Sequence, residues 1–441
     1  MNEKIAHTAD RLYRRTVNAW CMYDWANSAF ATTIMAAVLP TFYSSVAGAN
    51  LGGNRATVYW GYTVSIAMAI IAVSAPILGA IADYSGTKKR FLGGFASLGI
   101  LATALLYLVR TGDWLLASVL YIVGNIGFAG ADIFYNSLLP HVARRGDIDQ
   151  VSTKGYALGY LGGGLLLALN LAWIMFPRVF FLPNAEAASR VSFVSVAVWW
   201  AIFSIPLFRR VPEPPAMPTA RQPVNPVVGG IRQLAQTFRH IRQYRELWKF
   251  LIAFWLYNDG IGTIIKMATI YGSEIGIRQT DLIAALLITQ FVGIPFSLAF
   301  GRLAKWLGAK RSILLALATY TLISILGYFM SVAWHFYALA IMVGFVQGGS
   351  QALSRSLFGS MIPKAKTAEF FGFYDVSGKF AGIVGPFVFA LVGQLAGSSR
   401  LSIVSLVFFF VAGGLLLTRV DEKEGARMAE GVVPRPLGSA A

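Results

Sequence analysis

Long apolar segments recur along the whole chain and set its pattern of hydrophobic and polar positions. Each holds about 18 residues or more, enough to cross a hydrocarbon core of ~30 Å as a helix. The segments are continuous, whereas strands of a membrane barrel alternate over about ten residues. The pattern predicts twelve membrane-spanning helices in an all-α membrane protein, at residues 20–47, 57–83, 91–109, 114–139, 155–176, 191–208, 248–271, 282–304, 312–330, 334–359, 370–395 and 401–418.

A segment dense in proline and charge, "RRVPEPPAMPTARQPVNPVVGG", follows the sixth predicted span and divides the chain into two halves. The next stretch, "IRQLAQTFRHIRQYRELWKF", places apolar residues near one face and arginines largely elsewhere. It predicts a basic amphipathic helix on the inner membrane surface, with a partner-binding helix as the alternative. The predicted domains are an N-terminal six-helix bundle (1–208), a cytoplasmic linker (209–247), a C-terminal six-helix bundle (248–419) and a cytoplasmic tail (420–441).

The two halves match each other at corresponding places, which indicates an internal repeat. "GAIADYSGTKKR" follows the second span and "GRLAKWLGAKRS" follows the eighth, with glycines, a polar residue and a basic pair in the same order. "YD" opens the first span and "YND" the seventh, and the fifth and eleventh spans carry glycines at four-residue spacing, which allow close helix packing. Repeats that recur after six spans keep their orientation, so we expect parallel repeats around a pseudo-two-fold axis.

Composition agrees with a membrane protein, because 56% of the residues are hydrophobic and 13% are charged. The net charge of +17 follows the predicted topology: with both termini inside, 28 lysines and arginines lie in inner segments and 6 in outer loops. This is the positive-inside pattern, so the basicity indicates orientation and contact with anionic lipids rather than nucleic-acid binding.

Metal, cofactor and enzymatic chemistry find no support in the sequence. There is one cysteine and no CxxC or HExxH pattern, and the four histidines fall at span ends or in loops. "GFYDVSGKF" lacks the spacing and the Ser or Thr of a phosphate-binding loop, and no nucleophile triad shares one depth of the membrane. The first span is too long and too polar at its start for a cleaved signal peptide.

Polar residues inside the spans are the best guide to function, because a charge at mid-membrane costs at least ~2.5–3.5 kcal/mol unless it is paired or hydrated. They gather in every third span. The candidate cavity residues are Asp24 and Asn27 in the first span, Asn125, Asp132, Tyr135 and Asn136 in the fourth, Asn258, Asp259, Thr263 and Lys266 in the seventh, and Gln347, Gln351 and Arg355 in the tenth.

Each candidate also has a structural interpretation. Amides at helical spacing can bond across a helix interface for packing alone. Asp132 is a substrate or proton site or an ion-pair partner, and Arg355 is a carboxylate anchor or a side chain that snorkels to the inner surface. Asp24 either caps a helix N-terminus or stands at the inner entrance of a cavity.

Two further charges of the eleventh span, Asp375 and Lys379, are spaced as a pair that neutralises itself.

These residues resemble a known family. The twelve spans, the long basic central loop and the loop with Gly79, Asp83, Gly86, Lys88 and Lys89 look like the major facilitator superfamily. Within the superfamily, the chain is similar to the branch called the unknown major facilitator family, which includes the autophagy-related vacuolar amino-acid effluxers. The similarity lies in "YDWANSAF", "GAIADYSGTKKR" and "YNDGIGTI". The resemblance implies that the first, fourth, seventh and tenth helices line a central cavity and that the loop is a conformational latch.

The chain departs from the superfamily loop at two positions. Tyr84 stands where a basic residue is usual, and Lys305 stands where the second copy usually has an acid. We therefore expect the gating charge pair in the N-terminal half and not in the C-terminal half.

The sequence predicts a secondary active transporter, not an enzyme, that moves a small zwitterion or organic anion by alternating access. A proton on an interior carboxylate, Asp132 first and Asp24 second, is the expected coupling ion. We expect a monomer in the plasma membrane with both termini cytoplasmic, in contact with lipids and a small-molecule substrate and without cofactor. An exporter of lipids or lipophilic drugs and a receptor or scaffold without transport are the alternatives.

Overall fold

The computed structural model describes residues 2–85, 87–144, 148–213, 235–236, 238–239, 241–362, 370, 373–374, 377–378 and 382–431. In the N-terminal half these form α1 (Asn2–Ala29), η1 (Phe30–Ala37), α2 (Val38–Phe42), η2 (Tyr43–Ala47), α3 (Arg55–Ser85), α4 (Lys88–Leu105), η3 (Leu106–Leu108), α5 (Trp114–Val142), α6 (Ile148–Met175), η4 (Pro177–Phe180) and α7 (Ala185–Arg210). The C-terminal half has α9 (Arg245–Glu274), α10 (Gln279–Leu307), α11 (Ala309–Tyr328), α12 (Ala333–Ser360), α14 (Val384–Ala396), α15 (Ser399–Thr418) and α16 (Glu422–Gly431).

Within the described ranges, ten helices are long and apolar enough to cross a membrane, and they coincide with ten of the twelve predicted spans. The two others are the seventh and the eleventh. The seventh, α9, is 30 residues long but carries Asn258, Asp259 and Lys266, which lower its hydropathy. The eleventh contains α14, an apolar helix of 13 residues. The all-helical membrane architecture expected from the sequence is thus present.

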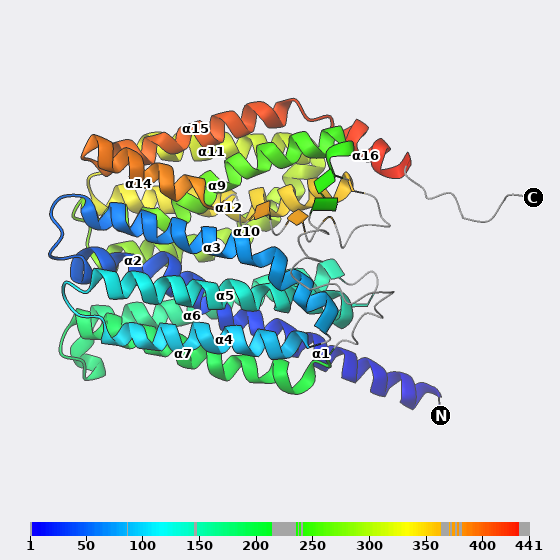
Figure 1. Cartoon of the computed structure of the whole chain (residues 1–441), viewed down its shortest axis with the longest axis horizontal. Helices are drawn as coiled ribbons and strands as arrows, with labels where there is room; N and C mark the ends of the chain where they lie inside the picture. The colour runs from blue at the N-terminus through cyan, green and yellow to red at the C-terminus, as the bar shows by residue number, and fades with distance from the viewer. Residues whose placement is uncertain are drawn as a thin grey trace, which may run out of the picture.

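The helices pack in two groups that follow the order of the chain (Figure 1). In the first group α1 packs against α6 and α7, and α5 packs against α3 and α4. In the second group α10 packs against α12, and α15 packs against α9, α11 and α14. The groups meet where α3 lies along α14 and α6 lies along α10. These pairs are the second span with the eleventh and the fifth with the eighth, as a repeat with two-fold symmetry requires.

The first span is not one regular helix. It passes from α1 through the π-helical η1 to α2 and then to the π-helical η2. Pro40 lies in α2 and has no N–H to donate to the carbonyl of Ala36, which an α-helix would bond to it. That carbonyl instead accepts a hydrogen bond of 2.6 Å from the hydroxyl of Thr269 in α9. The irregularity therefore frees a backbone group for a bond between the two halves.

The eleventh span is interrupted, which the sequence analysis did not predict. A turn at residues 382–383 precedes α14, which begins at Val384 within the predicted span and is buried at Gly385 and Pro386. Pro386 sits in the first turn of α14, the place where a helix tolerates the missing N–H. The amide groups of this buried helix start need acceptors from elsewhere in the protein.

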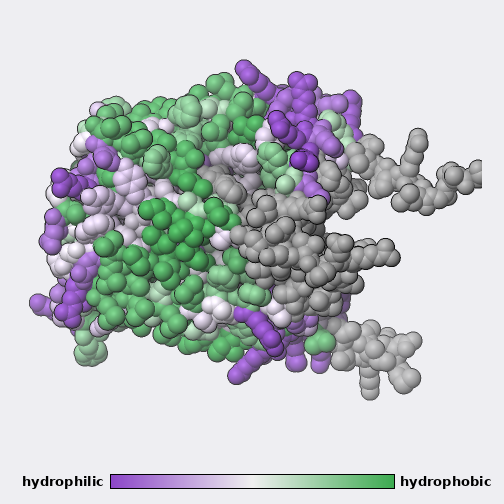
Figure 2. All heavy atoms as spheres, in the orientation of Figure 1, coloured by the Kyte–Doolittle hydropathy of each residue, from purple (hydrophilic) through white to green (hydrophobic). Residues whose placement is uncertain are grey.

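Figure 2 shows how the surface matches a bilayer. Hydrophobic residues cover a broad band across the middle of the molecule, and hydrophilic residues gather towards its two ends. Large apolar side chains on the surface of a membrane-spanning helix face lipid rather than water, which explains why Leu101, Val198 and Phe408 are 50–65% exposed.

The hydrogen bonds between the two groups gather at the end away from the chain termini, which Figure 1 draws on the left. The Asn54 amide donates to the carbonyl of Gly393 at 2.6 Å, and the Tyr62 hydroxyl donates to Gln394. Where α10 meets the N-terminal group, the Gln279 amide donates to Ser189 of α7 at 3.1 Å. We call the contact between α3 and α14 the α3–α14 seam.

Candidate functional site

The motif "YDWANSAF" lies within α1 and η1 and serves mainly to pack the N-terminal half. Trp25 stacks on Trp199 of α7, and the Trp199 indole donates to the carbonyl of Trp25 at 3.0 Å. Tyr23, Asn27 and Phe30 are buried. Most of the motif is thus helix packing.

Asp24 is the ionisable residue of this motif, and it does not cap a helix. Because α1 already begins at Asn2, Asp24 lies in the helix interior, and the capping interpretation is wrong. Its Oδ2 accepts a hydrogen bond of 2.8 Å from the hydroxyl of Tyr135 in α5. On the other side it abuts Gly155 of α6 so closely that a Cβ there would overlap the carboxylate.

Glycines of α6 continue this contact with α1 along the helix, as their spacing predicts. A Cβ at Gly159 would lie 2.5 Å from the hydroxyl of Ser28, and one at Gly163 would lie 2.9 Å from Thr32. The three glycines therefore bring α6 against the polar face of α1.

The remaining α5 candidates form contacts within their own helix. Asn136 donates to the Asp132 carboxylate at 3.1 Å, and Asp132 is near enough to Asp24 to act on it electrostatically. Asn125, a buried residue further along α5, donates to the Tyr121 hydroxyl at 3.5 Å, and its side-chain oxygen has no partner among the described residues.

Asp259 lies at the interrupted span. Its Oδ2 accepts a hydrogen bond of 2.7 Å from the backbone N–H of Gly385, in the first turn of α14. Its carbonyl accepts from the Thr263 hydroxyl at 2.7 Å. A Cβ at Gly385 would overlap the Thr263 hydroxyl, so only glycine fits there. The carboxylate thus supplies the acceptor that the α14 N-terminus needs, where the helix dipole favours negative charge.

Lys266 shares a face of α9 with Asp259, because seven residues make about two helical turns. The two side chains act on each other electrostatically but do not approach to ion-pair distance within the described part of the chain. The carbonyl of Lys266 accepts a hydrogen bond of 3.1 Å from the indole of Trp60 in α3. This face of α9 therefore looks toward α3 and α14.

The opposite face of α9 borders a largely apolar cavity with an empty volume of about 780 Å³, part of it open to the surface. Its walls come mainly from the C-terminal half, with Thr32, Ala36 and Leu167 from the N-terminal half. The other lining residues are Ile264, Ile265, Ala268, Tyr271, Leu286, Thr289, Gln290, Ile323, Gly327, Met330, Phe336, Leu339, Ala340, Val343, Gln347 and Ile403.

Of the thirteen candidate cavity residues, Gln347 borders this cavity. Gln351 of α12 is exposed, whereas Asn258 and Arg355 are half-buried. The sequence analysis missed Gln290, whose side-chain oxygen is buried without a partner among the described residues. It was missed because polar residues were sought in every third span, whereas α10 is the eighth span. The signal that could have found it is a polar amide in the middle of an apolar helix.

The candidate gating loop is described only in part. Gly86 lies outside the described residues, and so do the surroundings of Gly79 and the side chain of Asp83. Lys88 is buried, and the Lys89 ammonium donates to the carbonyls of Phe208 and Val211 at 2.9 and 2.7 Å. Lys89 therefore binds the C-terminal end of α7, where a cation is favoured by the helix dipole.

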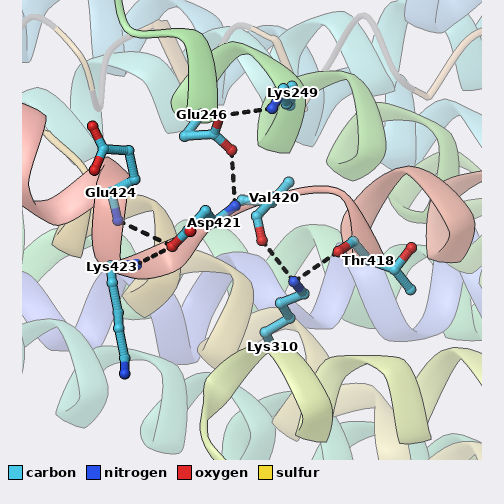
Figure 3. A network of polar contacts seen from close by, with 8 residues as sticks. All are labelled: Glu246, Lys249, Lys310, Thr418, Val420, Asp421, Lys423 and Glu424. Carbon is cyan, nitrogen blue, oxygen red and sulfur yellow. Dashed lines mark hydrogen bonds and ion pairs between the residues drawn. The ribbon is translucent and has the colours of Figure 1, made fainter.

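The second half repeats this arrangement, as Figure 3 shows. Lys310, the second residue of α11 as Lys89 is of α4, donates to the carbonyls of Thr418 and Val420 at 2.9 and 2.6 Å. One lysine thus binds the end of the last span in each half, although the sequence repeat aligns Lys310 with Lys88 rather than with Lys89.

Other sequence expectations fall at or beyond the edge of the described residues. Asp375 and Lys379 lie outside them. The amphipathic segment is described from Ala235 with gaps; there Phe238 packs against Trp248 with ring centroids 5.2 Å apart, and Arg239 and Arg242 are exposed. Across the described ranges no group of three or more His, Cys, Asp and Glu side chains could hold a metal ion, and Cys21 is a buried free thiol.

Comparison with known proteins identifies relatives along nearly the full length of the chain. The family described as "Vacuole effluxer Atg22 like" matches residues 13–430. An uncharacterized MFS-type transporter, YxiO of Bacillus subtilis (strain 168), is 39% identical over 427 residues, which cover 96% of this chain and 99% of that protein. Autophagy-related protein 22-1 of Penicillium rubens is 24% identical over 454 residues, covering 83% and 76% of the two chains.

Solved structures with similar folds are also transporters. A D-xylose-proton symporter has a TM-score of 0.67 at 13% identity, covering 94% of this chain and 99% of that one. The nucleoside transporter NupG has a TM-score of 0.60 at 15% identity, covering 93% and 98%. At this identity the likeness shows the fold alone, and it confirms the expected major facilitator architecture.

Proposed function

Because this chain belongs to the family of proteins like the vacuole effluxer Atg22 and is a transporter of the major facilitator type, we propose that it carries an amino acid or another small zwitterion or organic anion. The resemblance seen in the sequence is thereby confirmed at the level of the family, and the chain is a multi-pass membrane transporter rather than an enzyme. In this proposal it works by alternating access and is driven by protons.

The observation that carries the proposal is the set of interior charges of both signs. Asp24 and Asp132 lie in the N-terminal half, and Asp259 and Lys266 lie on one face of α9. Keeping ionisable groups within membrane spans is costly, so they favour a role in binding a charged solute or ion. A small zwitterion matches a site that offers both signs.

We propose that the solute enters between the two groups of helices from the membrane face opposite to the one that the α3–α14 seam closes. If both termini are cytoplasmic, as the positive-inside pattern predicts, the seam closes the outer side of a plasma-membrane protein. Rocking of the two groups would then open the seam and close the inner side. In this proposal the protein acts as a monomer.

A thermal-shift screen of the purified protein, followed by counterflow in proteoliposomes, tests the proposed substrate. Amino acids, peptides, sugars and organic acids are added one at a time. We expect an amino acid or an organic acid to raise the melting temperature and to exchange across the membrane, and Arg355→Ala to weaken that effect. If no zwitterion or organic anion is bound or exchanged, the proposal is wrong.

A lipophilic solute is the second candidate, and the apolar cavity beside α9 favours it. Apolar side chains, mainly Ile, Leu and Ala, dominate its lining. Such a substrate predicts transport that is insensitive to amino acids and that is reduced when Ala340→Phe fills the cavity. An amino-acid transporter whose solute avoids this cavity would keep its rate in the same variant.

A further inference from the structure

Asp259 is a buried carboxylate that the structure satisfies on one oxygen only. Asp259 is 3% exposed. Its Oδ2 receives the N–H of Gly385, whereas its Oδ1 is buried and has no hydrogen-bond partner among the described residues. A buried polar atom without a partner is uncommon in native proteins and calls for a functional or structural reason.

The other two candidate carboxylates differ in this respect. Asp24 accepts from the Tyr135 hydroxyl at 2.8 Å, and Asp132 accepts from the Asn136 amide at 3.1 Å. Neither has an oxygen that is both buried and without a partner in the described part of the chain. Asp259 is therefore the interior carboxylate with a free position where a cation can add.

The surroundings of that position suit a proton better than a metal ion. A Cβ at Gly385 would lie 2.7 Å from Oδ1 and 3.0 Å from the Asp259 carbonyl, so the α14 backbone closes the space beside the carboxylate. The neighbouring Thr263 hydroxyl already donates to that carbonyl. A hard metal ion requires a cage of several free oxygens, whereas a proton requires one.

The charged neighbour of Asp259 in the described residues is Lys266, on its own helix. The elements packed against it offer no further charge there. α14 presents the Gly385 N–H, α15 presents Phe409 and Phe410 beside Gly260, and α3 presents the Trp60 indole. Asp375 and Lys379, upstream of α14, lie outside the described residues.

The same helix start that bonds to Asp259 also forms part of the α3–α14 seam. The hydroxyl of Ser65 in α3 donates to the carbonyl of Ile383 at 3.2 Å, directly before α14. A Cβ at Gly61 would lie 3.1 Å from the carbonyl of Pro386, so α3 and α14 are in close contact here. A change in how firmly Asp259 holds α14 therefore acts on the seam within one helical turn.

We propose that Asp259 binds the coupling proton on Oδ1 and that its protonation controls the hold of α9 on α14 and hence the α3–α14 seam. The ionised form attracts the Gly385 N–H and the positive end of the α14 dipole and keeps the seam closed. Adding a proton removes that charge and weakens the hold, so the seam opens with the proton bound. This assignment rests on the proposed function and names the carboxylate through which it is coupled.

The test of coupling compares Asp259→Asn with Asp24→Asn and Asp132→Asn in proteoliposomes loaded with a pH-sensitive dye. Alanine, leucine, glutamate and lysine are added separately, and a solute that the wild type carries is then used. We expect Asp259→Asn to abolish proton movement and the pH dependence of net uptake but to retain counterflow, which shows that the variant is folded. In Asp24→Asn and Asp132→Asn, whose carboxylates belong to the proposed solute site, we expect proton movement and counterflow to fall together rather than separately.

Proton movement that persists in Asp259→Asn, or that is lost while counterflow persists in Asp24→Asn or Asp132→Asn, overturns the assignment. Uptake that needs sodium at constant pH overturns the identity of the ion. Each of these outcomes leaves the proposed amino-acid transport standing. Failure of the wild type to carry any tested solute counts against the proposed function, and the second measurement then decides on Asp259.

The second measurement needs no substrate. Spin labels are placed at the exposed ends of α3 and α14 through Arg55→Cys and Leu395→Cys, in a background where the native thiol is removed by Cys21→Ser. We expect the distance between the labels to increase as the pH falls in the wild type. In Asp259→Asn it should stay at the long value at every pH. A wild-type distance that ignores pH, or a variant that follows the wild type, overturns the proposal.

Discussion

At the scale of single residues, the contacts of glycine decide what the neighbouring polar groups can do. Gly155 and Gly385 each stand against a carboxylate from the first helix of their half, Asp24 or Asp259. Neither contact leaves room for a methyl group. The same device thus serves both halves, with a tyrosine hydroxyl completing one site and a helix N-terminus completing the other.

Gly155→Ala should destabilise the protein, because its methyl group must displace the Asp24 carboxylate from the Tyr135 hydroxyl. Overpacking of this kind costs roughly 1–3 kcal/mol. Gly164→Ala on the same helix is the control: its nearest neighbour, a Phe291 ring carbon, is 4.0 Å away, and alanine is the better helix former by ~0.5–1 kcal/mol. Thermal unfolding in detergent should therefore move in opposite directions; equal shifts would refute the contact.

At the scale of elements, several helix ends are fixed by side chains from other helices, in addition to local caps such as Asn184 at the start of α7. Lys89 binds the last carbonyls of α7, and Lys310 binds those of α15. Glu246 at the start of α9 accepts from the backbone N–H of Asp421 at 2.8 Å and from Lys249 at 2.6 Å (Figure 3). These bonds hold α16 at the same end of the C-terminal half.

Lys310→Met should loosen the end of α15, because two carbonyls lose a cationic donor. Each such bond contributes ~1.5 kcal/mol, with less expected from the more exposed one. Lys423→Met is the matched control, since Lys423 bonds to Asp421 through its backbone N–H and its side chain extends away from the network in Figure 3. Unfolding temperatures in detergent report the difference, and a shift as large for Lys423→Met would argue against it.

Acid should release α16. Burial raises the pKa of Glu246, but the Asp421 N–H and Lys249 outweigh it and leave the pKa below the ordinary value of 4.5. The pKa of Asp421 is lowered too, mainly by the Glu424 N–H. A lowered carboxyl pKa contributes stability at neutral pH that is lost as the pH falls through the folded-state value. The protection of the α16 amides from hydrogen exchange, relative to the intrinsic rate at each pH, should therefore fall below pH 4.5.

Glu246→Gln should raise exchange in α16 already at neutral pH and remove most of its dependence on acid. Glu424→Gln serves as the control, because that carboxylate is exposed and 3.9 Å from Arg427, a separation at which a surface pair contributes little. The role given to Glu246 fails if α16 stays protected at neutral pH in Glu246→Gln.

At the scale of the whole molecule, the two groups of helices are joined by bonds that the proposed alternating access must break. Thr269 donates to the Ala36 carbonyl at 2.6 Å, and this hydroxyl is completely buried. Thr269→Val keeps the shape of the side chain but leaves the Ala36 carbonyl without its donor. This destabilises the conformation with the closed seam by ~1–3 kcal/mol and leaves the open conformation unchanged. The variant should therefore populate the open seam.

Labels at Arg55→Cys and Leu395→Cys measure this shift as a longer distance in Thr269→Val at neutral pH. Thr319→Val is the control, because Thr319 donates to Leu315 within its own helix and its bond does not cross the molecule. An unchanged distance in Thr269→Val would show that this bond does not hold the two groups together.

Much of the fold could be predicted from the sequence. Apolar length alone located ten of the twelve predicted spans among the described residues, and the glycine spacing of the fifth span predicted close helix packing without identifying the first span as its partner. The break before α14 could not be predicted, because the apolar run from 370 to 395 continues through it. Of the candidate site, the sequence supplied Asp24 and Asp259 by their cost in lipid, but it could not tell which oxygen lacks a donor.

The sequence by itself determined the solvent of each segment, the orientation expected from its charges and the repeat of its halves, because hydrophobic length and charge act locally along the chain. The tertiary structure alone decided that Asp24 meets Tyr135, that Asp259 meets the start of α14 and that the apolar cavity lies on the other face of α9. These partners are more than a hundred residues apart for each carboxylate. Their pairing depends on how whole helices pack, which no local pattern encodes.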